Sequence, residues 1–167
     1  MMHGLGHDVV DLAAFASQLT EPGSRMRGLF SPRELRQAVA RAAQKNDGEA
    51  VHLAAKWAGK EAVLKAWCEA LSLAGYELPY TIDDFPWSQV EILDDSHGVP
   101  RVVLVSDAQR RFSESMVPLR RSGPASSPRF QWHLSLSHDG PVASAVAVLS
   151  SECRNVRATA ERAVSGT

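Results

Sequence analysis

Residues 53–67, with the sequence LAAKWAGKEAVLKAW, decide the fold and point to the functional site. Read as a helix at about 100° per residue, this stretch places Leu53 and Trp67 on one apolar stripe. Lys60 falls in the middle of that stripe, and Glu61 lies over small apolar neighbours. A half-buried charge costs several kcal/mol unless it is paired or bound to a metal. We therefore expect a polar group or a ligand to meet this face of the helix.

Lys65 follows Glu61 at a spacing of one helical turn. On its own, such a pair is typical of an ordinary surface ion pair worth a few tenths of a kcal/mol. The adjacent Lys60 favours a functional interpretation instead, as do Ala58 and Gly59, whose small side chains leave room for a ligand near the helix backbone. Both alternatives remain open on this stretch alone.

The composition is that of a single globular domain. The chain has 167 residues, 44% of them hydrophobic and 22% charged, with a net charge of -1. Such a length buries about two-thirds of the unfolded surface. The charge argues against general affinity for nucleic acid, and no apolar run reaches the roughly eighteen residues of a membrane span. The first residues lack a signal-peptide pattern and two cysteines form no disulfide framework, so we expect a cytoplasmic setting.

Hydrophobic periodicity predicts helices mainly in the N-terminal half and antiparallel strands mainly in the C-terminal half. Helices are expected over residues 13–19, 32–43, 49–74 and 107–115, and strands over 5–12, 90–94, 101–106, 131–138 and 142–149. Ser31 and Glu34 have the spacing of a capping box. This order indicates an α+β fold with one domain over residues 1–150. Residues 120–129 are expected to form a flexible loop and residues 151–167 a flexible tail.

Asp8 is the first candidate metal ligand outside the helix. A carboxylate at a strand end usually caps a helix or serves a turn. Asp11 is better placed to cap the next helix, which leaves Asp8 free to act as a ligand. Together with Glu61 it offers two carboxylates, a set that suits magnesium. The scattered histidines do not favour a zinc site.

Ser137, His138 and Asp139 contain the residue types of a hydrolase triad. Adjacent residues on a strand point to opposite sides, however, and the Gly-x-Ser-x-Gly elbow is missing. A histidine here is more often a core or turn residue with a partner. Gly4-Leu-Gly6 lacks the third glycine and the lysine of a phosphate-binding loop. We therefore expect neither a hydrolase triad at residues 137–139 nor a phosphate-binding loop at residues 4–6.

Three segments together resemble one family. Gly6-His-Asp8, residues 56–65 (KWAGKEAVLK) and Ser135-Leu-Ser-His138 are similar, in order and spacing, to the three motifs of the holo-acyl-carrier-protein synthases, the small 4′-phosphopantetheinyl transferases. Residues 30–35 (FSPREL) and 98–102 (GVPRV) also look like family positions. The resemblance covers roughly residues 4–149, and the central motif looks most like that of actinobacterial members.

The resemblance implies transfer of the phosphopantetheine arm of coenzyme A to a serine of an acyl-carrier protein or carrier domain, in fatty acid biosynthesis, with release of adenosine 3′,5′-bisphosphate. It implies a catalytic set of Asp8, Glu61 and Lys65, with the two carboxylates holding magnesium. Coenzyme A contacts are implied for Lys56, Lys60, Lys65, Ser137 and His138. Members of this family are generally homotrimers with active sites between subunits.

The first helix departs from the family because it has no arginine, whereas many members dock the acidic carrier with basic residues there. Arg25, Arg27, Arg33 and Arg36 are the expected replacements.

Two other functions remain as alternatives. One is a non-catalytic module of the same fold that binds coenzyme A or the carrier. The other is a structural assembly protein in which Lys60 and Glu61 form an interface ion pair.

Overall fold

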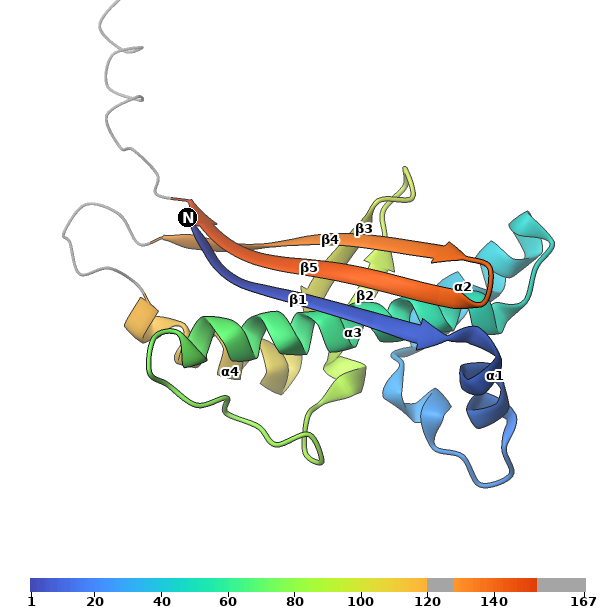
Figure 1. Cartoon of the computed structure of the whole chain (residues 1–167), viewed down its shortest axis with the longest axis horizontal. Coiled ribbons are helices and arrows are strands. Elements are labelled where there is room, and N and C mark those ends of the chain that lie inside the picture. Colours follow the sequence, from blue (N-terminus) through green and yellow to red (C-terminus); the bar gives the residue numbers. More distant parts are fainter. Residues whose placement is uncertain (120–127, 153–167) are drawn as a thin grey trace, which may run out of the picture.

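A three-stranded antiparallel sheet and one long helix form the centre of the computed structural model, which describes residues 1–119 and 128–152. The sheet contains β1 (Met2–Asp11), β5 (Val142–Glu152) and β4 (Arg129–Asp139) in that order, so β1 and β4 are its edges. Helix α3 (Glu49–Ser72) lies along one face of this sheet (Figure 1). This arrangement confirms the predicted α+β class.

The remaining elements pack around α3 and β4. They are helices α1 (Leu12–Thr20), α2 (Pro32–Lys45) and α4 (Ser106–Ser115), strands β2 (Val90–Asp94) and β3 (Pro100–Leu104), and the short 3₁₀ helices η1 (Met26–Leu29), η2 (Trp87–Gln89) and η3 (Val117–Leu119). Strands β2 and β3 form a separate antiparallel hairpin that contacts α2, α3 and β4. Because α3 is covered by the sheet and by these elements, it is apolar on most of its surface, and Leu53 and Trp67 are fully buried.

Strand β1 lies directly against the backbone of α3. Gly4 and Gly6 face the helix, and a Cβ atom at either position would collide with a carbonyl oxygen of α3, that of Ala66 or Ala62. Only glycine permits an approach this close. The contact brings the following inward residue of the strand, Asp8, against the middle of the helix.

The expected helix signals are present. The Ser31 hydroxyl accepts a hydrogen bond from the Glu34 N–H (3.2 Å), and the Glu34 carboxylate accepts one from the Ser31 N–H (2.8 Å), which completes the capping box. Helix α2 ends at Asn46 in the left-handed conformation. None of the helices in the described part of the chain combines the length and apolar character needed to cross a membrane.

Strand boundaries differ from expectation at both ends of the chain. β1 begins at Met2, and β5 continues to Glu152, where Ser151 accepts a hydrogen bond from the Met1 amino group (2.7 Å). The first two residues of the expected tail are therefore part of the sheet. Residues 153–167 and 120–127, which contain the rest of that tail and most of the expected loop, lie outside the described residues. The domain boundary at residue 150 stays a prediction.

Candidate active site

Asp8 and Glu61 form a pair of neighbouring carboxylates between β1 and α3. The alternation of β1 turns Asp8 inward, where it is 7% exposed, and Glu61 lies on the facing side of the helix. Burial, followed by the neighbouring, negatively charged carboxylate of Asp8, raises the pKa of Glu61 to about 7. The structure thus brings together the two residues that the sequence predicted as metal ligands.

Lys65 completes this group. Its Nζ donates a hydrogen bond to Asp8 Oδ1 (2.7 Å) and a second to the carbonyl oxygen of His7 (3.0 Å), and its side chain remains half exposed. Its charge opposes the rise in the pKa of Glu61. Lys65 is therefore an exposed cation at the rim of the carboxylate pair, and its ion pair is with Asp8 rather than with Glu61, the partner that the spacing along the helix suggested.

The carboxylate pair fits a divalent cation. Asp8 Oδ2 is buried and has no hydrogen-bond partner within the described ranges. A buried carboxylate oxygen without a partner is unfavourable, and a cation would satisfy it. Magnesium typically takes one or two protein carboxylates and completes its coordination with water and substrate phosphate. Among residues 1–119 and 128–152 no group of three or more His, Cys, Asp or Glu side chains gathers, so Asp8 and Glu61 would be the two protein carboxylates of such a site, and water and substrate phosphate would complete it.

Lys60 lies inside the protein rather than at the site. It is fully buried, and its Nζ donates to Glu34 Oε2 (2.8 Å) and to the carbonyl oxygens of Trp87 (2.7 Å) and Val90 (2.6 Å). Burial lowers the pKa of Lys60, and the carboxylate of Glu34 opposes that shift. The predicted contact of Lys60 with coenzyme A conflicts with this burial. The polar partner expected for this face of the helix is Glu34, a residue of the same chain.

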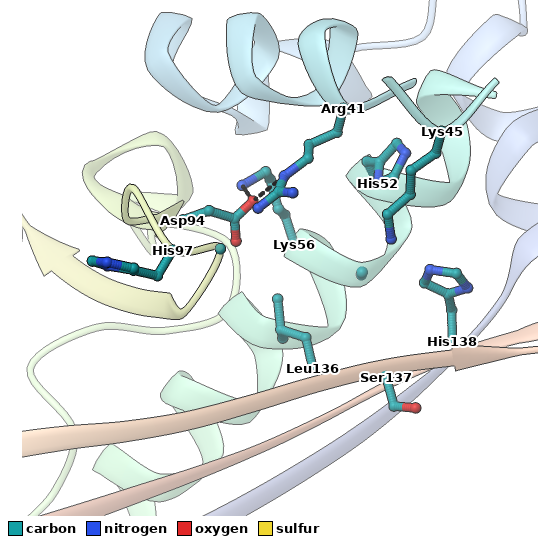
Figure 2. Close-up of a pocket in the computed structure, with 11 residues that line it drawn as sticks. Arg41, Lys45, His52, Lys56, Asp94, His97, Leu136, Ser137 and His138 are labelled. Carbon is teal, nitrogen blue, oxygen red and sulfur yellow. Dashed lines mark hydrogen bonds and ion pairs between the residues drawn. The ribbon is translucent and has the colours of Figure 1, made fainter. Parts of the chain in front are cut away.

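A basic pocket of about 340 Å³ lies between α2, α3, β4 and the β2–β3 turn (Figure 2). It contains two predicted coenzyme A contacts, Lys56 and His138, whose positions in the sequence are far apart. Ser137 also lines the pocket, but its hydroxyl points to the other side of β4 because adjacent strand residues alternate. Of the predicted coenzyme A contacts, only Lys56 and His138 direct side chains towards this cavity.

The sequence did not predict four further basic or imidazole side chains of the pocket: Arg41, Lys45, His52 and His97. Arg41 and Lys45 share one face of α2 at a spacing of four residues, but His52 and His97 come from two other elements, so no spacing along the chain connects all four. The His52 ring lies 6.5 Å from the His138 ring and bonds to Asp47 (2.7 Å). The histidines looked scattered in the sequence, and the fold gathers three of them here. A lining of this charge suits a phosphate group.

The carboxylate pair and the basic pocket lie at opposite edges of the sheet. Asp8 on β1 pairs with Ala145 on β5, and Ala145 pairs with Leu136 on β4, which lines the pocket. Two strand spacings of about 4.8 Å therefore separate the two positions. Asp8, Glu61 and Lys65 are not part of the pocket lining. The carboxylate pair and the basic pocket are thus two separate sites on one chain.

The four arginines predicted to dock the carrier divide into two pairs. Arg27 forms a bidentate pair with Glu49, and Arg33 pairs with the buried Glu91 (2.9 Å). Arg25 and Arg36 are exposed. Hence Arg27 and Arg33 also link parts of the fold, and their charges are partly neutralised.

Comparisons with known proteins agree on one family. The model of the 4′-phosphopantetheinyl transferase superfamily matches residues 4–142. The holo-acyl-carrier-protein synthase of Bifidobacterium adolescentis is 57% identical over 154 residues, which cover 89% of this chain and 99% of that protein. The corresponding enzyme of Bifidobacterium animalis subsp. lactis is also 57% identical, over 89% of this chain and 97% of its own length.

A solved structure shows the same fold. The Chronobacterium ammoniagenes ACPS-CoA complex has a TM-score of 0.74 and 31% identity, and the match covers 91% of this chain and 98% of that one. The family resemblance drawn from the three motifs is therefore confirmed. The chain belongs to the 4′-phosphopantetheinyl transferase superfamily and is an enzyme of the holo-acyl-carrier-protein synthase type.

Proposed function

We propose that this enzyme transfers the 4′-phosphopantetheine arm of coenzyme A to a serine of an apo acyl-carrier protein or carrier domain, with release of adenosine 3′,5′-bisphosphate. The product would serve fatty acid biosynthesis in the cytoplasm. The observation that carries this proposal is the carboxylate pair of Asp8 and Glu61 with Lys65 beside it. Phosphoryl transfer depends mainly on positioning and on neutralisation of charge, which is what these three groups provide.

Asp8 and Glu61 would hold magnesium, whose charge would stabilise the leaving bisphosphate. Asp8 Oδ2, which has no hydrogen-bond partner among the described residues, supports this assignment. Lys65, half exposed beside Asp8, is placed to contact the pyrophosphate of coenzyme A. Lys60 keeps a different role: its buried hydrogen bonds to Glu34 and to the backbone near β2 hold the turn of α3 that carries Glu61.

The basic pocket would bind the adenosine 3′-phosphate. Lys56 and His138 are the primary contacts in this proposal, and Arg41 and Lys45 add positive charge to the same cavity. Ser137 contributes to the wall of the pocket, whereas its hydroxyl faces away. A phosphate that meets several cations in a partly enclosed site gains strong charge-assisted hydrogen bonds.

The separation of the carboxylate pair from the basic pocket supports a homotrimer with active sites between subunits. In such an assembly the β1 edge of one subunit would supply the carboxylates, and the β4 edge of a neighbour would supply the basic pocket. The sheet face away from α3 exposes Leu5, Val9 and Val146, which are 47%, 53% and 37% exposed. Exposed apolar side chains grouped on one sheet face favour contact with another copy of the chain.

The carrier would dock beside α2 and η1. Arg25 and Arg36 are the primary docking residues in this proposal because Arg27 and Arg33 already have carboxylate partners. Opposite charges across such an interface mainly accelerate encounter and set the register of the two proteins.

Mass spectrometry of an apo carrier protein tests the proposal most directly. Incubation with the enzyme, coenzyme A and magnesium should add one phosphopantetheine arm to the carrier, and a chelator should abolish the addition. Binding of coenzyme A without any change in carrier mass would instead favour the non-catalytic module. The presence of both Asp8 and Glu61 supports the enzyme over that module.

A further inference from the structure

The outer edge of β2 is paired with side chains rather than with another strand. β2 pairs with β3 along its other edge, so alternate residues turn their N–H and C=O groups outward. These residues are Val90, Ile92 and Asp94. The Val90 N–H bonds to the carbonyl oxygen of Trp87, and the other five outward groups bond to side chains of α2 and α3.

Two helices supply these side chains from regularly spaced positions. From α3, Lys60 donates to Val90 O (2.6 Å) and Lys56 donates to Ile92 O (2.7 Å). From α2, Glu34 accepts from Ile92 N–H (2.9 Å), and Gln37 both accepts from Asp94 N–H and donates to Asp94 O (2.9 Å each). The spacings of four and three residues place each pair on one helix face. The hairpin is thereby held in register with both helices.

Gln37, like Glu34, contacts a lysine of α3 as well as the edge of β2, and the lysine that it contacts is the one that lines the pocket. Its Oε1, which accepts from Asp94 N–H, also accepts from the Nζ of Lys56 (3.2 Å). Lys56 is 3% exposed and lines the basic pocket. A single amide thus joins the end of β2 to the pocket lysine. Burial lowers the pKa of Lys56, and the negative charge of Asp94 opposes that shift.

The turn after β2 depends on the same connection. Asp94 pairs with Arg41 (3.4 Å; Figure 2), and the guanidinium of Arg41 occupies the space that a Cβ at Gly98 would need. His97 and Gly98 of this turn form one wall of the pocket. Movement of Asp94 would therefore displace the wall and Arg41 as well as Lys56.

We infer that Gln37 is a positioning residue for coenzyme A, which fixes Lys56 and the β2–β3 turn relative to each other so that the pocket fits the 3′-phosphate. This inference rests on the proposed function, which assigns that phosphate to the basic pocket. Gln37 is not part of the pocket lining. It acts through Lys56 and Asp94.

Calorimetric titration with coenzyme A and with 3′-dephospho-coenzyme A tests the inference on the intact protein. Gln37→Met removes the amide while keeping the length of the side chain. It should weaken coenzyme A binding about tenfold, the effect of one hydrogen bond to a charged group. Binding of the dephospho compound should change less than about twofold. The exposed Gln18→Met on α1 is a matched control that should bind both ligands as the parent protein does.

The outcomes separate the inference from the proposed function. A parent protein that binds both compounds equally would overturn the assignment of the pocket to the 3′-phosphate. A parent protein that discriminates, with the same preference in Gln37→Met, would overturn the positioning role alone. Equal losses for both ligands would mean that Gln37 only stabilises the fold, which also overturns the inference.

Two further measurements guard against misfolding. Circular dichroism should show Gln37→Met folded at the titration temperature. Gln37→Asn, which is too short to reach both partners, should show the same selective loss and replaces the Met variant if that variant does not fold. In steady-state assays the KM for coenzyme A should rise while kcat stays within about twofold of the parent value.

Discussion

Glu61 carries a charge at a position where a charge is unfavourable without a cation. It is partly buried and lies beside the carboxylate of Asp8, so its pKa rises to about 7. Two like charges at one site are commonly a feature of function rather than of stability. The exposed Lys65 compensates this repulsion only in part.

Glu61→Gln should abolish the transfer reaction while the fold remains intact. The amide keeps the volume of the side chain but removes one charge from the magnesium site, so we expect a rate lower by several orders of magnitude. Carrier modification followed by mass spectrometry measures the rate, and circular dichroism checks the fold. Asp8→Asn should behave alike, with partial recovery at high magnesium. A fully active Glu61→Gln enzyme would refute the assignment of the metal ligands.

The same substitution should increase stability at neutral pH in chelator-treated buffer. The folded pKa of Glu61, about 7, lies above its ordinary value of 4.5, so the folded protein binds the proton more tightly than the unfolded chain. The parent protein therefore loses stability as the pH rises from about 4.5 to about 7, whereas Glu61→Gln does not. Urea unfolding of both proteins should show that the variant has the higher free energy of unfolding. This difference should grow from about pH 4.5 to about pH 7 and stay constant above pH 7. A constant difference at every pH would contradict this explanation.

At the scale of elements, the buried pair of Lys60 and Glu34 joins α3 to α2 and β2. Glu34→Ala leaves the fully buried Lys60 without its carboxylate, and we expect a loss of about 3–5 kcal/mol in urea unfolding. Glu114→Ala, which removes an exposed ion pair with Arg110, is the control and should cost less than about 1 kcal/mol. Replacing Lys60 by Met in a Glu34→Leu background should recover only part of the loss, because Val90 and Ile92 also lose hydrogen bonds.

The docking of the carrier also belongs to this scale. Helix α1 has no charged residue, so Arg25, just before η1, and Arg36 of α2 would meet an acidic carrier. Reversing Arg25 and Arg36 to Glu should raise the carrier KM and leave the coenzyme A KM nearly unchanged. The effect should shrink as salt rises, since exposed charges are screened over about 8 Å at physiological ionic strength. Arg110→Glu on α4 is the control. If both KM values rise together, these arginines affect the nucleotide site or the assembly instead.

At the scale of the whole molecule, the proposed homotrimer with active sites between subunits predicts that two inactive variants can restore each other. Glu61→Gln damages the carboxylate pair beside the β1 edge, and His138→Ala damages the basic pocket at the β4 edge. In a mixed assembly, some interfaces would combine an intact β1 edge from one chain with an intact β4 edge from the other. We therefore expect activity after co-expression of the two variants. Co-expression of Glu61→Gln with Asp8→Asn, which both damage the carboxylate pair, should stay inactive. Absence of recovery in the first mixture would place the whole site within one chain.

The sequence predicted those features that depend on local order along the chain. The apolar stripe of residues 53–67 predicted the long helix, and the position of Lys60 in that stripe predicted a polar partner. It did not identify Glu34 as that partner, because the capping box already explained Glu34. It also missed Arg41, Lys45, His52 and His97, since separate elements bring these side chains into one pocket. Such contacts depend on tertiary packing, which has no period in the sequence.

The direct contact between β1 and α3 also determines which sequence changes the active site can tolerate over evolutionary time. In most of the core, side chains lie between the packed elements, and a change in their size changes the distance between those elements. Gly4 and Gly6 leave no side chain between strand and helix, so peptide dimensions alone set the gap between Asp8 and Glu61. The surrounding core can therefore drift in sequence without loosening the carboxylate pair, whereas any side chain at these two glycines would separate it.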